Sequence, residues 1–248
     1  MSSLPSRQPM SFGGGLRAFL GGVGFIIGTP GVWGWALVPA FLALVMLIVS
    51  CSLGLWAGSH LADWLMGEVT GFWATTGSWL LKTGLWLLAI ILSLLLALFL
   101  TQPLSGFALE AIVRAQERDL GHPHGEPPGR VSALLLTVQA TGLSLGFGIP
   151  AIVGLTVVGL LFPPAIIVTL PLKFLICAWM LAWDFLDYPL GLRGMPVSAR
   201  LSWISRRMGA FTAFGLAWTS LLIVPGMVLL ILPMGVAGAT RMVVQEEA

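Results

Sequence analysis

The stretch GLWLLAIILSLLLALFL, residues 84–100, is apolar on every side of a helix and carries no charge. At a rise of about 1.5 Å per residue, about 20 such residues cross a hydrocarbon core of roughly 30 Å. The uncharged run extends from Thr83 to Leu109, and a dense charged segment, residues 110–118, follows at once. This stretch therefore predicts a full membrane span that ends at a charged surface.

Beyond Pro103 the hydrophobic pattern becomes one-sided, with apolar residues at helical spacing and charged residues opposite them. This pattern predicts an amphipathic helix that lies on the membrane surface. Its expected apolar face consists of Leu104, Phe107, Ala108, Ala111, Ile112 and Ala115, and its expected polar face of Glu110, Arg114, Glu117 and Arg118.

The composition indicates an all-α integral membrane protein. Of 248 residues, 57% are hydrophobic and 9% are charged, with a mean hydropathy of +0.97, whereas soluble domains carry roughly 25% charged residues. The net charge of +2 is small and dispersed, which excludes a nucleic-acid partner. The two cysteines have no metal-ligand spacing, and we expect neither a disulfide, a metal nor a cofactor.

The N-terminal third contains a first span and a helix before it. We expect residues 1–11 to form a mobile tail and residues 12–27 to form an interfacial helix, although glycines interrupt its apolar face. The sequence Gly28-Thr-Pro-Gly31 breaks this helix, and the uncharged run 37–55 then supplies a span. Residues 58–81 hold acidic residues but no Lys or Arg, so we expect this segment to be an outer loop and both chain termini to be cytoplasmic.

The second half is rich in helix breakers. The segment 121–130 reads as an inner linker, and its His122, His124 and Glu126 are too few to indicate a metal site. Breaks are expected at Gly148-Ile-Pro150, Pro163-Pro164 and Pro171, which leaves either two crossings or a re-entrant hairpin between the arginines that flank them. Residues 224–226 divide the last apolar block into halves of about 15 residues, roughly 22 Å each, which favours a half-penetrating hairpin.

Such broken helices must pack against one another. Backbone that is not helical at membrane depth is tolerated only inside protein or beside a watery cavity. If the turns line a cavity, the free amides at the starts of half-helices present partial positive charge to it. This arrangement favours an anionic solute.

Four motifs stand in order along the chain: Pro30–Pro39 (PGVWGWALVP), Gln102–Glu110 (QPLSGFALE), Asp187–Pro189 (DYP) and Pro233–Thr240 (PMGVAGAT). Together, at these distances from two spans, they resemble the CysZ-like sulfate permease family, which also contains the etoposide-induced proteins. The resemblance covers nearly the whole chain, and we treat residues 1–248 as a single domain of this type.

The resemblance implies a bacterial inner-membrane protein with two long spans and two half-penetrating hairpins, which admits sulfate for cysteine synthesis and forms an oligomer. In this family a Gly-Leu-Arg motif before the first span is associated with sulfate. The matching residues here are Gly31, Val32 and Trp33, so the arginine is absent and the loop amides and Thr29 remain as donors.

Three charged residues are candidates for the pathway or gate. Glu110 is the first charge after the long span and falls in a family motif, Lys173 lies alone among apolar residues, and Arg193 is the first arginine after the first broken block. Solvated-face, snorkelling and lipid-anchoring roles are the alternatives for these three residues.

We predict from the sequence a permease or channel-like protein for sulfate or a related small oxyanion, in contact with membrane lipids and assembled as a homo-oligomer. A membrane scaffold of the same fold that does not transport is the alternative, which the missing arginine favours. The chain shows neither a nucleophile with a paired base nor a convincing metal-ligand set, so we expect no enzymatic activity.

Overall fold

The computed structural model describes residues 10–67, 71–123, 130–224 and 227–247, and their regular structure is helical throughout. The chain divides into two compact units, which are described separately below. Unit 1 comprises Met1–Ala36 and Ala108–Ala248, as far as these are described, and unit 2 comprises Leu37–Phe107. The predicted all-α fold class is confirmed.

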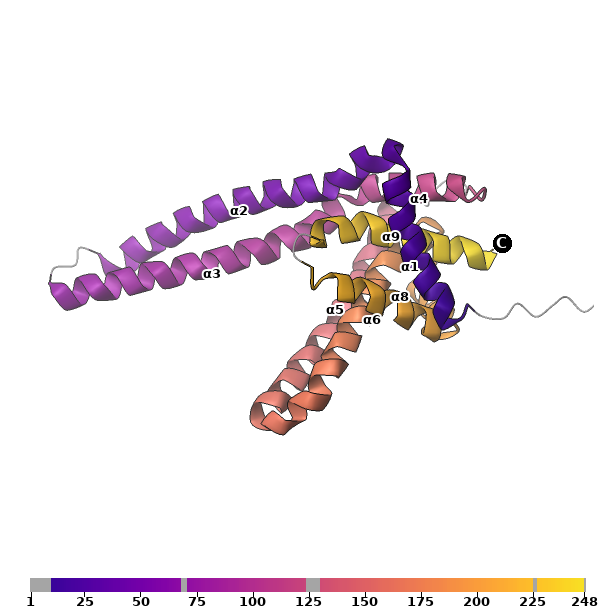
Figure 1. Ribbon diagram of the computed structural model, residues 1–248. Coiled ribbons are helices and arrows are strands. Elements are labelled where there is room, and N and C mark those ends of the chain that lie inside the picture. Colours follow the sequence, from indigo (N-terminus) through magenta and orange to yellow (C-terminus); the bar gives the residue numbers. More distant parts are fainter. Residues whose placement is uncertain (1–9, 68–70, 124–129, 225–226, 248) are drawn as a thin grey trace, which may run out of the picture. The chain divides into compact units, whose positions relative to one another are not determined.

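Unit 2 is a long helical hairpin. Helices α2 (Trp33–Met66) and α3 (Phe72–Leu104) lie side by side (Figure 1). Their apolar segments, Pro30–Leu65 and Thr75–Ala97, are long and apolar enough to cross a membrane. The loop predicted over residues 58–81 is wrong in its extent, because α2 continues to Met66 and α3 begins at Phe72. Its place on the outer side stays a prediction.

Small side chains hold the two helices of this hairpin together. A side chain at Gly54 would touch the Cβ of Ala89 and the hydroxyl of Ser93, both at 3.2 Å. The Ser50 hydroxyl lies 3.2 Å from the Ser93 carbonyl oxygen. Lipid provides no hydrophobic force between helices, so close packing of this kind and hydrogen bonds across the seam stabilise the pair.

In unit 1 the chain folds into several shorter helices around one apolar core. The core consists mainly of buried residues from the first helix, from residues 109–113 and from the last four helices, which lie within residues 166–247. The elements are α1 (Phe12–Gly28), η1 (Pro30–Val32), α4 (Gly106–Asp119), α5 (Arg130–Leu161), η2 (Pro163–Ala165), α6 (Ile166–Leu192), α7 (Val197–Ser205), α8 (Met208–Leu221) and α9 (Val228–Glu247).

Glycines explain how α1 is stable within this unit. Gly15 and Gly22 are buried, and a Cβ on either would collide with the backbone of α8 or α9. The same glycines would weaken an isolated helix by about 1 kcal/mol each, but here they allow α1 to pack closely against its neighbours. The helix predicted over residues 12–27 is confirmed, while its place at the membrane interface stays a prediction.

The amphipathic helix after the second span is present as α4, but its buried face differs from the one we expected. Glu117, which was expected on the polar face, is buried and forms an ion pair with Arg193 inside unit 1, so the prediction was wrong for this residue. Leu104 and Phe107, expected on the apolar face, are exposed, and their contact with lipid stays a prediction. The buried residues of α4 are Ala108, Leu109, Ile112, Val113, Gln116 and Glu117.

Two of the predicted helix breaks are wrong. Helix α5 continues through Pro150, and α6 continues through Pro171. A single proline removes one backbone hydrogen bond, and neighbouring helices let a membrane helix tolerate this loss. The break at Pro163-Pro164 is confirmed, because two successive prolines remove two donors and disfavour helical geometry in the residue before each.

The two hairpins of unit 1 differ in length. Helices α5 and α6 lie side by side (Figure 1) and extend about 48 and 40 Å from their 32 and 27 residues. Both therefore exceed the hydrocarbon thickness. Helix α8, with 14 residues, reaches about 21 Å and falls short of it. Half-penetration stays a prediction for both hairpins, and α8 gives it the stronger support.

Candidate functional site

The predicted substrate-binding residues form one turn between α1 and α2. Thr29 ends α1, and the short helix η1 then leads directly into α2. The Val32 amide donates to the Thr29 carbonyl at 3.0 Å, which closes this turn. The Val32 side chain is buried in the core of unit 1, whereas Gly31 is exposed with open space around the position of its missing Cβ.

Trp33 is the residue at which the resemblance would place an arginine, and its indole is already engaged. The indole Nε1 donates to the carbonyl oxygen of Ile26 at 2.7 Å, which fastens the turn to the last part of α1. The ring is half exposed. Position 33 therefore contributes a structural link to α1 and no positive charge.

The turn offers backbone donors to a ligand. The Gly31 amide has no acceptor among the described residues, and the Thr29 hydroxyl makes no capping hydrogen bond. Both groups stand at the N-terminal side of α2, where the helix dipole contributes about half a positive charge. This arrangement suits an anion, although a helix start alone is a weak and unselective site.

Glu110 is neutralised locally. Arg114, one turn further along α4, donates to the same carboxylate oxygen from Nε at 3.0 Å and from Nη2 at 2.8 Å. Both side chains are more than one-third exposed. The pair contributes a few tenths of a kcal/mol to the stability of the helix.

Lys173 lies near the start of α6, inside the candidate span Pro163–Leu192, and is half-buried. In the part of the chain that the structure describes, no carboxylate lies within ion-pair distance of its ammonium group. Among the described residues, no ion pair joins Lys173, Glu110 and Arg193 to one another.

Arg193 is placed by the end of α6. Gly194 follows it in the left-handed conformation (φ 66°), and the Gly194 and Met195 amides close the helix on the carbonyls of Gly191 and Leu190. The Arg193 side chain turns back and is 5% exposed. It forms ion pairs with Glu117 at 3.0 Å and with Glu247 at 2.6 Å.

Two further ion pairs involve arginines for which the sequence pattern predicts no partner. Arg200 is buried and pairs with Asp187, and Arg207 pairs with Glu246 at 2.7 Å. The partners lie 13 and 39 residues apart. The sequence indicates these ion pairs only in that acidic and basic residues both gather at the ends of apolar segments. That pattern does not show which residues pair.

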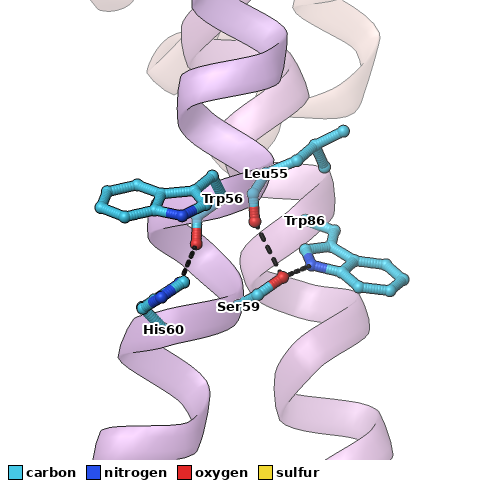
Figure 2. A pocket seen from close by; sticks show the side chains of 5 residues that line it. All are labelled: Leu55, Trp56, Ser59, His60 and Trp86. Carbon is cyan, nitrogen blue, oxygen red and sulfur yellow. Dashed lines mark hydrogen bonds between the residues drawn. The ribbon is translucent and has the colours of Figure 1, made fainter.

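A cavity of about 310 Å³ lies on the hairpin of unit 2 (Figure 2). Its polar groups satisfy one another: the Trp86 indole donates to the Ser59 hydroxyl at 3.0 Å, and that hydroxyl donates to the Leu55 carbonyl at 2.9 Å. His60 Nδ1 lies 2.9 Å from the Trp56 carbonyl oxygen. The cavity therefore leaves neither the indole of Trp86 nor the hydroxyl of Ser59 free for an anion.

No metal site is evident in the described residues, in which no three potential ligands come together. Of the three residues considered in the linker, His122 is exposed. His124 and Glu126 lie outside the described residues.

Comparison with known proteins gives consistent results. The family model described as sulfate transporter CysZ/etoposide-induced protein 2.4 matches residues 18–233. The chain is 28% identical to the sulfate transporter CysZ of Pseudomonas syringae pv. tomato, over 89% of this chain and 88% of that protein. It is 26% identical to the sulfate transporter CysZ of Pseudomonas aeruginosa (strain LESB58), over 90% and 91%.

The family match spans the turn at residues 29–33, the charged ends of α4 and α6, and the start of α9, so it includes each predicted site residue. It contains three of the four sequence motifs in full and ends at Pro233, where the fourth begins. The chain belongs to the CysZ/etoposide-induced protein 2.4 family.

Proposed function

We propose that the chain is a permease or channel-like protein that carries sulfate, or a related small oxyanion, across the bacterial inner membrane. The observation that carries this proposal is the match to proteins named sulfate transporter along about nine-tenths of both sequences. The four segments that are long and apolar enough to span a membrane support it. A transporter of this family also agrees with our expectation that the chain is not an enzyme.

The turn between α1 and α2 is our candidate for the entry site of the anion. Thr29, Gly31, Val32 and Trp33 would act through backbone amides and the Thr29 hydroxyl, since Trp33 supplies no charge and its indole is bound to Ile26. A site without a guanidinium lacks the charge-assisted, bidentate bonds that favour oxyanions. We therefore expect weaker sulfate binding here than at a site that holds an arginine.

Lys173 is our first candidate for the pathway. An ammonium group within a span is costly unless it faces protein or water, and Lys173 has no acidic partner among the described residues. Glu110 is the second candidate, because its pair with Arg114 is exposed and can open at low cost. Arg193 is held by two carboxylates, so a pathway role for it requires that one of them leaves.

The proposal extends to the setting of the protein. Both termini would be cytoplasmic, because arginines gather at the inner ends of the spans. The candidate spans bury only 11–22% of their residues within this chain, which leaves apolar faces for lipid and for further copies of the chain in a homo-oligomer. The imported sulfate would supply sulfur assimilation and cysteine synthesis.

A scaffold of the same fold that does not transport is the rival function. The engaged indole of Trp33 favours it, because the position that carries the family arginine here holds α1 to η1. The test is growth of a bacterial strain without sulfate uptake, with limiting sulfate as the sole sulfur source. We expect the chain to restore growth on sulfate without changing growth on cysteine. Failure to restore growth, with the protein present in the membrane, would favour the scaffold.

Restoring the arginine gives a prediction for the entry site. Trp33→Arg should lower the sulfate concentration needed for half-maximal uptake by about tenfold, equivalent to about 1.4 kcal/mol, because a charge-assisted hydrogen bond is added. The measurement is the concentration dependence of labelled sulfate uptake. Trp35→Arg is the matched control, since it adds the same charge at another exposed tryptophan nearby. Equal effects of both substitutions would contradict a specific site at position 33.

A further inference from the structure

A cluster of ion pairs joins the ends of four helices in unit 1. Arg193 follows α6, Arg207 precedes α8, Glu117 lies in the last turn of α4, and Glu246 and Glu247 lie at the end of α9. We call these five residues the inner ionic cluster. Two guanidinium groups face three carboxylates in it, so the cluster carries one net negative charge.

The Arg193 guanidinium forms the two-bond contact by which arginines bind oxyanions, and here its partner is the carboxylate of Glu247. The guanidinium donates to both carboxylate oxygens of Glu247, from Nε at 2.6 Å and from Nη2 at 2.9 Å. Its Nη1 donates to the Pro189 carbonyl at 2.9 Å and lies within ion-pair distance, 3.0 Å, of Glu117 Oε1. Two parallel N–H···O bonds of this kind match the geometry of a carboxylate or phosphate group, and a sulfate presents oxygens at similar spacing.

Arg207 holds Glu246, the residue before Glu247 in α9. The Arg207 Nη2 donates to Glu246 at 2.7 Å, and its Nη1 donates to the Trp203 carbonyl at 3.0 Å. The guanidinium group also lies over the indole ring of Trp203, 4.5 Å from the ring centroid. Its Nε is buried and has no acceptor among the described residues. A buried donor without a partner costs about 1–3 kcal/mol, so Arg207 retains unused capacity for an acceptor.

The position of the two glutamates favours their displacement. The C-terminal end of a helix carries partial negative charge, which disfavours carboxylates there, and α9 ends with two of them. Glu247 is 38% exposed, whereas the Arg193 side chain that it covers is 5% exposed. Water and small ions therefore reach the carboxylate, and its departure would open the Arg193 fork to the surface.

We propose that the guanidinium fork of Arg193 is an oxyanion-binding site that Glu247 occupies as an internal substitute for the ligand, while Arg207 holds the neighbouring Glu246. An incoming sulfate-like dianion takes the Arg193 fork, and the end of α9 is released. This inference rests on the proposed function for the class of ligand. It adds a second anion site, distinct from the turn at residues 29–33, whose occupancy changes the end of α9.

The test is sulfate binding by the purified full chain in detergent, measured as the rise in thermal unfolding midpoint with sodium sulfate at constant ionic strength. Glu247→Gln keeps the size of the side chain but weakens its hold on the guanidinium. We expect half-saturation at a sulfate concentration about tenfold lower than in the wild type. Asp119→Asn, the matched control, removes another exposed carboxylate, at the end of α4, and should leave half-saturation unchanged.

Two further variants keep the result decisive. Adding Arg193→Lys to Glu247→Gln retains the charge but removes the fork, and should abolish the gain. If Glu247→Gln does not fold, Glu247→Asp, which shortens the reach to Arg193, should give a smaller gain of the same sign. Half-saturation that is the same in all variants, or that falls equally in Asp119→Asn, would overturn the site.

This outcome is separable from the fate of the proposed function. Sulfate uptake into vesicles is measured on the same protein preparations. A binding gain in Glu247→Gln without uptake by any variant would support the site and contradict transport. Uptake by the wild type with no binding gain would contradict the site and leave transport in place.

Discussion

Gly22→Ala is expected to destabilise unit 1 severely, although it adds a single methyl group. Gly22 is buried in α1, and a Cβ there would collide with the Met234 carbonyl oxygen and lie 2.5 Å from the Gly238 amide nitrogen of α9. Backbone cannot turn aside as a side chain can, so α1 must move away from α9. Overpacking of this kind costs typically 1–3 kcal/mol and occasionally more, and we expect about 3 kcal/mol or above.

Gly24→Ala in the same helix provides the control. Gly24 is exposed, and nothing lies within 4 Å of the position of its Cβ. Alanine there should stabilise the helix by about 0.5–1 kcal/mol, because glycine loses more backbone entropy on folding. The two substitutions thus have opposite signs two residues apart. Equal thermal unfolding midpoints for both variants in detergent would contradict the packing of α1 on α9.

Arg200→Met should have an effect of similar size. Arg200 is 1% exposed, donates to the Asp187 carboxylate and bonds the Met195 carbonyl at 2.8 Å. Removing it leaves the largely buried Asp187 charge without its partner. Breaking a buried pair in this way costs about 3–5 kcal/mol. The change is measured as a loss of unfolding free energy, or as failure to obtain folded protein.

Two other variants separate this effect from general sensitivity to charge. Replacing both partners, Asp187→Leu with Arg200→Met, removes the unpaired charge and should recover most of the stability, because buried pairs are often replaceable by apolar residues. Arg114→Ala disrupts the exposed pair with Glu110 and should cost well under about 1 kcal/mol. A cost for Arg200→Met no larger than that of Arg114→Ala would show that Asp187 is solvated.

Hydropathy predicted where helices form better than where they end. The run 84–100 indicates a helix from its composition alone, and α3 contains it. Helices α2 and α3 extend beyond the apolar runs and include Asp63 and Lys82, the charged residues outside those runs. These two residues form an ion pair across the hairpin at 2.7 Å. A charge ends an apolar run in the sequence, but it need not end a helix that reaches the interface.

Of the two candidate sites, local sequence predicts one and not the other. Residues 29–33 are contiguous, so their arrangement as one turn before α2 follows from the local breaker residues. The inner ionic cluster joins segments up to 130 residues apart, from Glu117 to Glu247, and its pairs depend on how helices pack. An arginine at a helix end has the same local sequence whether it faces lipid or a buried carboxylate.

Entry of labelled sulfate into liposomes that contain only the purified protein is the most direct test of sulfate transport. We predict an initial rate well above that of empty liposomes, driven by the sulfate gradient alone, and a reduced rate with Lys173→Ala. Uptake equal to that of empty liposomes, with the protein folded and inserted, would contradict transport and leave the scaffold as the better description of this chain.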